Sequence, residues 1–212
     1  MKKPPIQEQL KKKIMILDGA MGTMIQQENL TAEDFGSDDL DGCNEVLCVT
    51  RPDVIQKIHE AYFAAGADMI ETNTFGTTSV VLAEYDLQDR HRELNIAAAK
   101  LAIAAAEKYS TPEWPRYVVG AMGPTTKTLS VTGGVTFEQL EESYYEQALA
   151  LIEAGVDAML LETSQDTLNV KAGSIGIRRA FESGWQADAN IDVSRETRDG
   201  IAPAFGVVRS ET

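Results

Sequence analysis

The chain contains one structural pattern twice, and this repeat limits the folds that are open to it. Ala65-Gly66-Ala67-Asp68 leads through a short apolar run to Glu71-Thr72, and Ala154-Gly155-Val156-Asp157 leads in the same way to Glu162-Thr163. Both segments read as a helix that ends at glycine, then a buried strand, then a Glu-Thr pair at the carboxyl end of that strand. Acidic residues that recur at strand ends favour a (β/α)8 barrel of the TIM-barrel family over an open, doubly wound sheet.

Apolar runs alternate with amphipathic stretches, and together they predict about four βα units. Parallel strands, adjacent in chain order, are expected near residues 14–18, 68–72, 117–122 and 157–162. Helices are expected at about 53–65, 87–109, 136–154 and 165–181, with Gly173 and Gly176 weakening the last one. A complete barrel takes about 250 residues, so these units predict an incomplete α/β barrel.

The pattern divides the chain into three parts. Residues 1–13 read as a polar leader, 14–182 as the partial barrel, and 183–212 as a divergent tail with at most one short strand near 204–208. Four strands cannot close a barrel, so unless the tail covers it we expect the strand at 157–162 to keep an open edge through which the chain can self-associate. We also expect Val, Ile and Met side chains on the lining face to be exposed.

The net charge of −14 argues against nucleic acid as a partner, because phosphate binding needs clustered Lys and Arg. No apolar run reaches the length of about 18 residues that a membrane helix needs. The apolar stretch after the basic N-terminus covers only Ile14 to Leu17. It is too short for a secretory leader, so we expect a cytoplasmic protein. The acidic segment 28–45 reads as a solvated loop.

The two cysteines, Cys43 and Cys48, have a spacing that could form half of a zinc site. A structural zinc needs four ligands, and only His59 and His91 remain to supply the others. Packing cysteines are therefore the preferred interpretation, and no metal ligand is expected in this chain.

Strand ends at the carboxyl rim build the active sites of barrels. Backbone N–H groups of Gly19, Ala20 and Met21 could hold a carboxylate there, while Asp18 or Glu162 could accept a hydrogen bond from an ammonium group. The same acids could instead cap the helices that follow, and paired carboxylates also suit a glycosidase. The residues expected on this rim are Asp18, Glu71, Asn73, Gly123, Pro124, Glu162, Thr163 and Asp166.

Five motifs carry a resemblance to a known family. They are Asp18-Gly19-Ala20-Met21-Gly22-Thr23-Met24, Gly42-Cys43-Asn44-Glu45 with Thr50-Arg51-Pro52-Asp53, Glu71-Thr72-Asn73-Thr74-Phe75, Gly123-Pro124-Thr125 and Glu162-Thr163-Ser164-Gln165-Asp166-Thr167-Leu168-Asn169. In this order they resemble the homocysteine-binding barrel of cobalamin-dependent methionine synthases, over about residues 14 to 182.

The resemblance implies methyl transfer to the sulfur of homocysteine, giving methionine. In that family methylcobalamin is the donor, recharged from methyltetrahydrofolate on later domains, and zinc is held by three cysteines in the second half of the barrel. This sequence lacks an adjacent cysteine pair, so the chain is expected to bind neither zinc nor cobalamin and to be inactive alone. The residues that the resemblance assigns to homocysteine binding are Asp18, Gly19, Ala20, Met21, Glu71, Asn73, Gly123, Glu162, Thr163 and Asp166.

Two hypotheses follow for the function. The chain is either a methyltransferase module whose activity requires the missing half, or a non-catalytic fragment of a truncated or frame-shifted gene. The loss of pattern in the tail favours the second. A different barrel enzyme, such as a phosphate-handling aldolase, lacks support because no late glycine-rich phosphate loop is visible.

Overall fold

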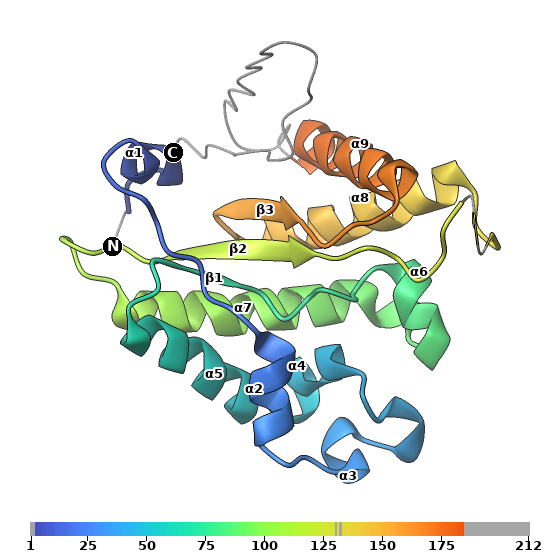
Figure 1. Ribbon diagram of the computed structural model, residues 1–212, viewed down its shortest axis with the longest axis horizontal. Helices are drawn as coiled ribbons and strands as arrows, with labels where there is room; N and C mark the ends of the chain where they lie inside the picture. Colours follow the sequence, from blue (N-terminus) through green and yellow to red (C-terminus); the bar gives the residue numbers. More distant parts are fainter. Residues whose placement is uncertain (1–2, 130, 132, 185–212) are drawn as a thin grey trace.

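A parallel sheet of three strands lies at the centre of the computed structural model, which describes residues 3–129, 131 and 133–184 (Figure 1). The strands are β1 (Met69–Glu71), β2 (Tyr117–Met122) and β3 (Ala158–Leu161), in the order β1-β2-β3. Met69 pairs with Tyr117, and Val119 pairs with Ala158. Three of the four expected strands are therefore confirmed in place, direction and order, with slightly shorter bounds.

The expected strand at 14–18 is reduced to a single parallel bridge between Leu17 and Met69. The segment lies beside β1, because the N–H of Asp18 donates to the carbonyl of Met69 at 3.0 Å and the N–H of Asp68 donates to that of Ile16 at 2.8 Å. Ile14 and Ile16 are 92% and 60% exposed. The prediction of a full buried strand was wrong, because the segment pairs with β1 at one bridge only and buries Met15 on one face while Ile14 and Ile16 stay exposed.

Four long helices cover the outer side of the sheet, as right-handed crossovers require. They are α5 (Pro52–Ala65), α7 (His91–Tyr109), α8 (Phe137–Ala154) and α9 (Thr167–Gly184). Helix α5 begins with proline and ends at Gly66 in the left-handed region (φ 109°). Helix α8 begins with a capping box between Thr136 and Gln139 and ends at Gly155 (φ 91°).

Each long helix packs on the next around the sheet, and apolar clusters fill the layer between them. One cluster joins Phe63 of α5 and Ile70 of β1 to the alanines of α7. Another joins Met122 of β2 to Leu140 and Tyr144 of α8. All six residues of β2 are buried. The expected exposure of the lining face is therefore limited, among the described residues of these sheet segments, to Ile14 and Ile16.

The leader packs against the barrel instead of standing apart from it. Ile6 of α1 (Ile6–Leu10) is 6% exposed and contacts a cluster with Met15 and Tyr117. Lys3 Nζ donates to Asp157 Oδ2 at 2.5 Å, and Lys13 Nζ donates to Asp68 Oδ1 at 2.5 Å.

The two aspartates of the sequence repeat hold the start of the sheet in the same way. Asp68 Oδ2 accepts a hydrogen bond from the N–H of Ile16 at 3.0 Å, and Asp157 Oδ2 accepts one from the N–H of Val118 at 2.8 Å. Each carboxylate thus joins the start of its own strand to the neighbouring segment, and a leader lysine compensates its charge. The repeat therefore has a structural role at the amino end of the sheet.

The acidic segment 28–45 belongs to an ordered region and is not a simple solvated loop. Its helices and those that flank it are α2 (Met21–Gln27), α3 (Ala32–Phe35), η1 (Asp38–Leu40), η2 (Asn44–Val46) and α4 (Leu47–Thr50). Ile25, Phe35 and Leu47 bury their side chains against α5 and α7. The solvated-loop prediction missed these apolar contacts because they are separated by acidic residues in the sequence.

Three short elements, α6 (Ser79–Leu82), η3 (Ala83–Tyr85) and η4 (Gln88–Arg90), connect β1 to α7. Because η4 occupies the start of the stretch that we assigned to one helix, α7 begins at His91 instead of residue 87. None of the described helices is both long and apolar enough to cross a membrane. The predictions for the tail beyond residue 184 lie outside the described residues.

Candidate functional site

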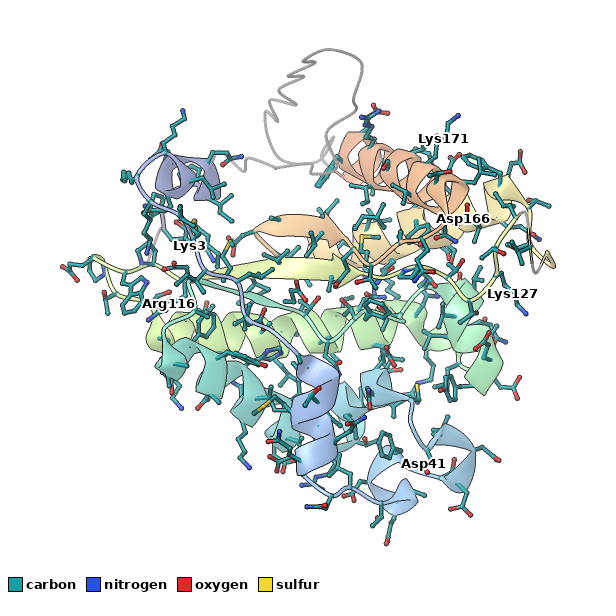
Figure 2. All side chains as sticks on the ribbon, in the orientation of Figure 1. Lys3, Asp41, Arg116, Lys127, Asp166 and Lys171 are labelled. Carbon is teal, nitrogen blue, oxygen red and sulfur yellow. The ribbon has the colours of Figure 1, made fainter. Side chains whose placement is uncertain are left out.

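The candidate site lies at the carboxyl ends of the strands, where four segments meet. Asp18 follows the bridge residue Leu17, Glu71 closes β1, Gly123 follows β2 and Glu162 follows β3. The N–H of Glu71 donates to Asp18 Oδ1 at 2.9 Å, and the N–H of Glu162 donates to the carbonyl of Met122 at 3.1 Å. Asp166 lies at this end of the sheet, while Lys3 and Arg116 lie at the opposite end (Figure 2).

Three carboxylates on this rim share one electrostatic environment. Burial is the largest cause of their shifts: it raises the pKa of Asp18 to about 8, that of Glu71 to about 7, and that of Glu162 above its ordinary value. The charge of Glu162 adds to the raised pKa of both other acids, and the charge of Glu71 adds to that of Asp18. Since no Lys or Arg of the described chain contributes to these shifts, the rim favours a positively charged ligand group.

The turn after Asp18 exposes backbone donors. Gly19 and Ala20 lead into α2, of which Met21 is the first residue, and Ala20 occupies the N-cap position with φ −55° and ψ 89°. No side chain caps this helix. The N–H groups of its first turn therefore remain available for an acceptor such as a carboxylate.

Asn73 is turned toward the loop before α4, not toward the three carboxylates. Its side chain is 6% exposed, and its Nδ2 donates to the carbonyl of Asn44 at 2.8 Å and to Cys48 Sγ at 3.4 Å. Asn73 thus fastens that loop to the end of β1.

Glu45 is a half-buried acid that the sequence interpretation did not single out. Its Oε1 accepts a hydrogen bond from the N–H of Gly76 at 2.9 Å, and burial raises its pKa. A β-carbon on Gly76 would stand 2.7 Å from that oxygen, so the contact requires glycine. Glu45 is part of the Gly42-Cys43-Asn44-Glu45 motif, but its position in the acidic segment 28–45 predicted a solvated side chain.

Gly123 lies where the loops after β1 and β2 touch. A β-carbon there would stand 2.7 Å from the carbonyl oxygen of Phe75, to which the N–H of Gly123 donates at 3.0 Å. The carbonyl of Gly123 accepts from Tyr144 Oη at 2.9 Å, and this hydroxyl also bonds to Asn169. Tyr144 and Asn169 were not among the predicted site residues, yet they connect this loop to α8 and α9.

The segment after β3 combines an unusual backbone with a helix start. Thr163 has φ 54°, a conformation that is rare for a β-branched residue, and its hydroxyl donates to Glu162 Oε2 at 3.3 Å. Asp166 Oδ1 accepts a hydrogen bond from the N–H of Leu168 at 2.9 Å, in the first turn of α9. The capping role, which the sequence left open for strand-end acids, therefore applies to Asp166.

The cysteines do not fit the zinc that the family resemblance implies. Cys43 and Cys48 are buried free thiols, and burial raises their pKa values to about 11 and about 12. Thiolates bind zinc, so such thiols are poor ligands. No group of three His, Cys, Asp or Glu side chains in the described part of the chain could hold a metal ion.

Comparison with known proteins shows the family of the chain. A sequence model of the family described as homocysteine S-methyltransferase matches residues 15–203, and so extends beyond the boundary placed at 182. The chain is 44% identical over 191 residues to a methionine synthase of Mycobacterium leprae and 46% identical over 172 residues to that of Mycobacterium tuberculosis. These matches cover 90% and 81% of this chain but only 16% and 14% of the relatives' lengths.

Solved structures show the same fold. The metallated form of the homocysteine methyltransferase MmuM from Escherichia coli matches with a TM-score of 0.69 and 23% identity, over 84% of this chain and 64% of that one. Its oxidized form matches with a TM-score of 0.68 and 24% identity, over 85% and 63% of the two chains. The parallel sheet, the outer helices and these matches make the structure a part of a TIM barrel, and the chain belongs to the homocysteine S-methyltransferase family.

Proposed function

We propose that this chain forms the amino-acid-binding half of a homocysteine S-methyltransferase site of the methionine synthase type. The observation that carries the proposal is the group of three rim carboxylates, Asp18, Glu71 and Glu162, whose mutual repulsion a bound ammonium group relieves. The N–H groups of Gly19, Ala20 and Met21 then receive the substrate carboxylate. Gly123, Thr163, Asp166 and Asn73 shape the loops around this rim.

The proposed reaction of the complete protein is methyl transfer to the homocysteine sulfur. In that protein methylcobalamin, recharged from methyltetrahydrofolate, would supply the methyl group, and zinc would lower the pKa of the homocysteine thiol so that it reacts as a thiolate at neutral pH. No described residue of this chain fits either group. What the chain contributes is substrate binding and orientation.

The test of the proposal is Glu162→Gln. Replacing the carboxylate by an amide removes a charge-assisted hydrogen bond to the substrate amine, so homocysteine should bind at least about tenfold more weakly, which is about 1.4 kcal/mol. Isothermal titration calorimetry on the 212-residue chain measures this. Glu107→Gln, on the exposed side of α7, is the matched control and should bind as the wild type does. Unchanged affinity in Glu162→Gln would remove the assignment.

The alternative of a non-catalytic fragment is favoured by the cysteine content, since the chain has two cysteines and both are buried. We expect the purified chain to hold no stoichiometric zinc and to transfer no methyl group to homocysteine, because a protonated thiol is a poor nucleophile. Elemental analysis checks the first expectation. One equivalent of bound zinc that disappears when Cys43 or Cys48 is replaced would contradict it.

A further inference from the structure

Tyr62 of α5 reaches the turn that follows Asp18. Its hydroxyl oxygen lies 3.6 Å from the place where a β-carbon on Gly19 would stand, and its Cε1 lies 3.9 Å from it. The half-buried ring packs against two apolar clusters, one containing Ile58 and the other containing Phe63. Packing on both sides therefore holds the hydroxyl beside the main chain of the turn.

Only backbone groups of the described residues donate to the carboxylate of Asp18. Its Oδ1 accepts the hydrogen bond from the N–H of Glu71, its own N–H also lowers its pKa, and no side-chain donor contributes. The other charged groups that act on Asp18 are Glu71 and Glu162, and an ionised carboxylate can only accept. Burial and the charge of Asp18 raise the pKa of Tyr62, so this phenol keeps its proton and remains a donor.

We propose that Tyr62 is a positioning residue that donates its hydroxyl hydrogen to Asp18 Oδ2 when the substrate amine binds, and so keeps Asp18 ionised and directed at that amine. This inference rests on the proposed function of the rim. A hydrogen bond to a carboxylate favours its charged form. Burial raises the pKa of Asp18 to about 8, so its carboxyl group is mostly protonated at pH 7 and mostly ionised at pH 9 unless a donor or a cation stabilises the charge.

The test compares homocysteine binding to the wild type and to Tyr62→Phe at pH 7 and at pH 9, by calorimetry on the full chain. Tyr62→Phe should bind about five- to tenfold more weakly at pH 7 and less than about twofold more weakly at pH 9. Comparing the two proteins at each pH cancels the ionisation of homocysteine itself. Tyr109→Phe removes a hydroxyl from a ring that stacks on Phe63 and should bind as the wild type does at both pH values.

Three outcomes would overturn the inference. Equal affinities at pH 7 would show that the hydroxyl contributes nothing, and an equal loss at both pH values would show a purely structural role. In both cases the wild type still binds homocysteine, and the proposed function stands. A wild-type chain that does not bind homocysteine would contradict the proposed function and this inference together.

A second measurement does not depend on the folding of Tyr62→Phe. In the wild type with ¹³C-labelled tyrosine, one of the six tyrosine Cζ resonances should titrate together with Asp18, because the hydroxyl senses that charge. Asp18→Asn should abolish this titration. A spectrum in which no tyrosine responds to Asp18 would overturn the inference.

Discussion

Asp18 combines two opposing demands. Its carboxylate must be near the ligand to accept from an ammonium group, yet it is partly buried beside Glu71 and Glu162 with no compensating cation among the described residues. Its folded pKa of about 8 lies above its ordinary value, so the folded state binds a proton that the unfolded state releases. Its contribution to stability is therefore present below about pH 4 and is lost as the pH rises through about 8.

Asp18→Asn should remove this pH dependence. The amide keeps an oxygen that can accept from the N–H of Glu71 but carries no charge. At pH 8 the variant should be more stable than the wild type by about 1–2 kcal/mol, less than the full linkage value because solvent screens the rim. At pH 4 the two proteins should be equally stable. Denaturant unfolding at the two pH values measures the difference.

Asp39→Asn serves as the control, because Asp39 is exposed in η1 and far in sequence from the rim. It should leave the difference between pH 4 and pH 8 unchanged. A wild type that is more stable than Asp18→Asn at pH 8 would show that Asp18 has a stabilising partner that this account lacks.

The roles of single residues could be predicted from the sequence only where the signal is local. The strand ends located Asp18, Glu71 and Glu162 on one rim, since parallel strands bring their carboxyl ends together. The direction in which Asn73 points and the burial of Glu45 depend on the packing of a loop from elsewhere in the chain. The spacing of residues within these two motifs does not predict contacts with a distant loop.

At the scale of elements, the crossing of α8 and α9 shows how a local rule can mislead. Gly173 and Gly176 lower helix propensity, so the sequence alone predicts a weakened helix there. In the structure they allow α9 to approach closely, because a β-carbon on Gly176 would stand 2.7 Å from the carbonyl oxygen of Glu141 and 2.8 Å from the nitrogen of Tyr145. Both atoms belong to the main chain of α8, which cannot move aside easily.

Gly176→Ala tests this reading. Alanine is the better helix former by about 1 kcal/mol, so propensity alone predicts stabilisation. Overpacking against α8 should dominate, and the free energy of unfolding should fall by about 2 kcal/mol. Ser174→Ala, on the same helix, should change stability by less than about 0.5 kcal/mol. Stabilisation by Gly176→Ala would contradict the close crossing.

Element boundaries followed the sequence where caps and glycine stops define them. Gly66 and Gly155 end their helices in the left-handed region, and the capping box at Thr136 begins α8 as expected. The segment 14–18 differs, because only one residue of it, Leu17, forms a bridge and the side chains of Ile14 and Ile16 remain exposed. Here only β1 is beside it in the described structure.

At the scale of the whole molecule, the described structure is part of a barrel whose amino and carboxyl ends have different roles. At the amino end, Asp68 and Asp157 hold the strand starts together with Lys13 and Lys3. At the carboxyl end, the acids lack cations and can receive a substrate. Homocysteine is the proposed substrate, and because the chain has two cysteines, both buried, we expect this rim to recognise the amino group of the ligand and not its thiol.

The most direct test of this claim compares three ligands on the 212-residue chain by calorimetry. Homocysteine and 2-aminobutyrate, which lacks the thiol, should bind with affinities within about fivefold of each other, because no thiolate site contributes. 4-Mercaptobutyrate, which keeps the thiol and the carboxylate but lacks the amine, should bind at least about tenfold more weakly than homocysteine. Equal binding of 4-mercaptobutyrate and homocysteine, or a loss of binding for 2-aminobutyrate alone, would contradict an account based on the rim carboxylates.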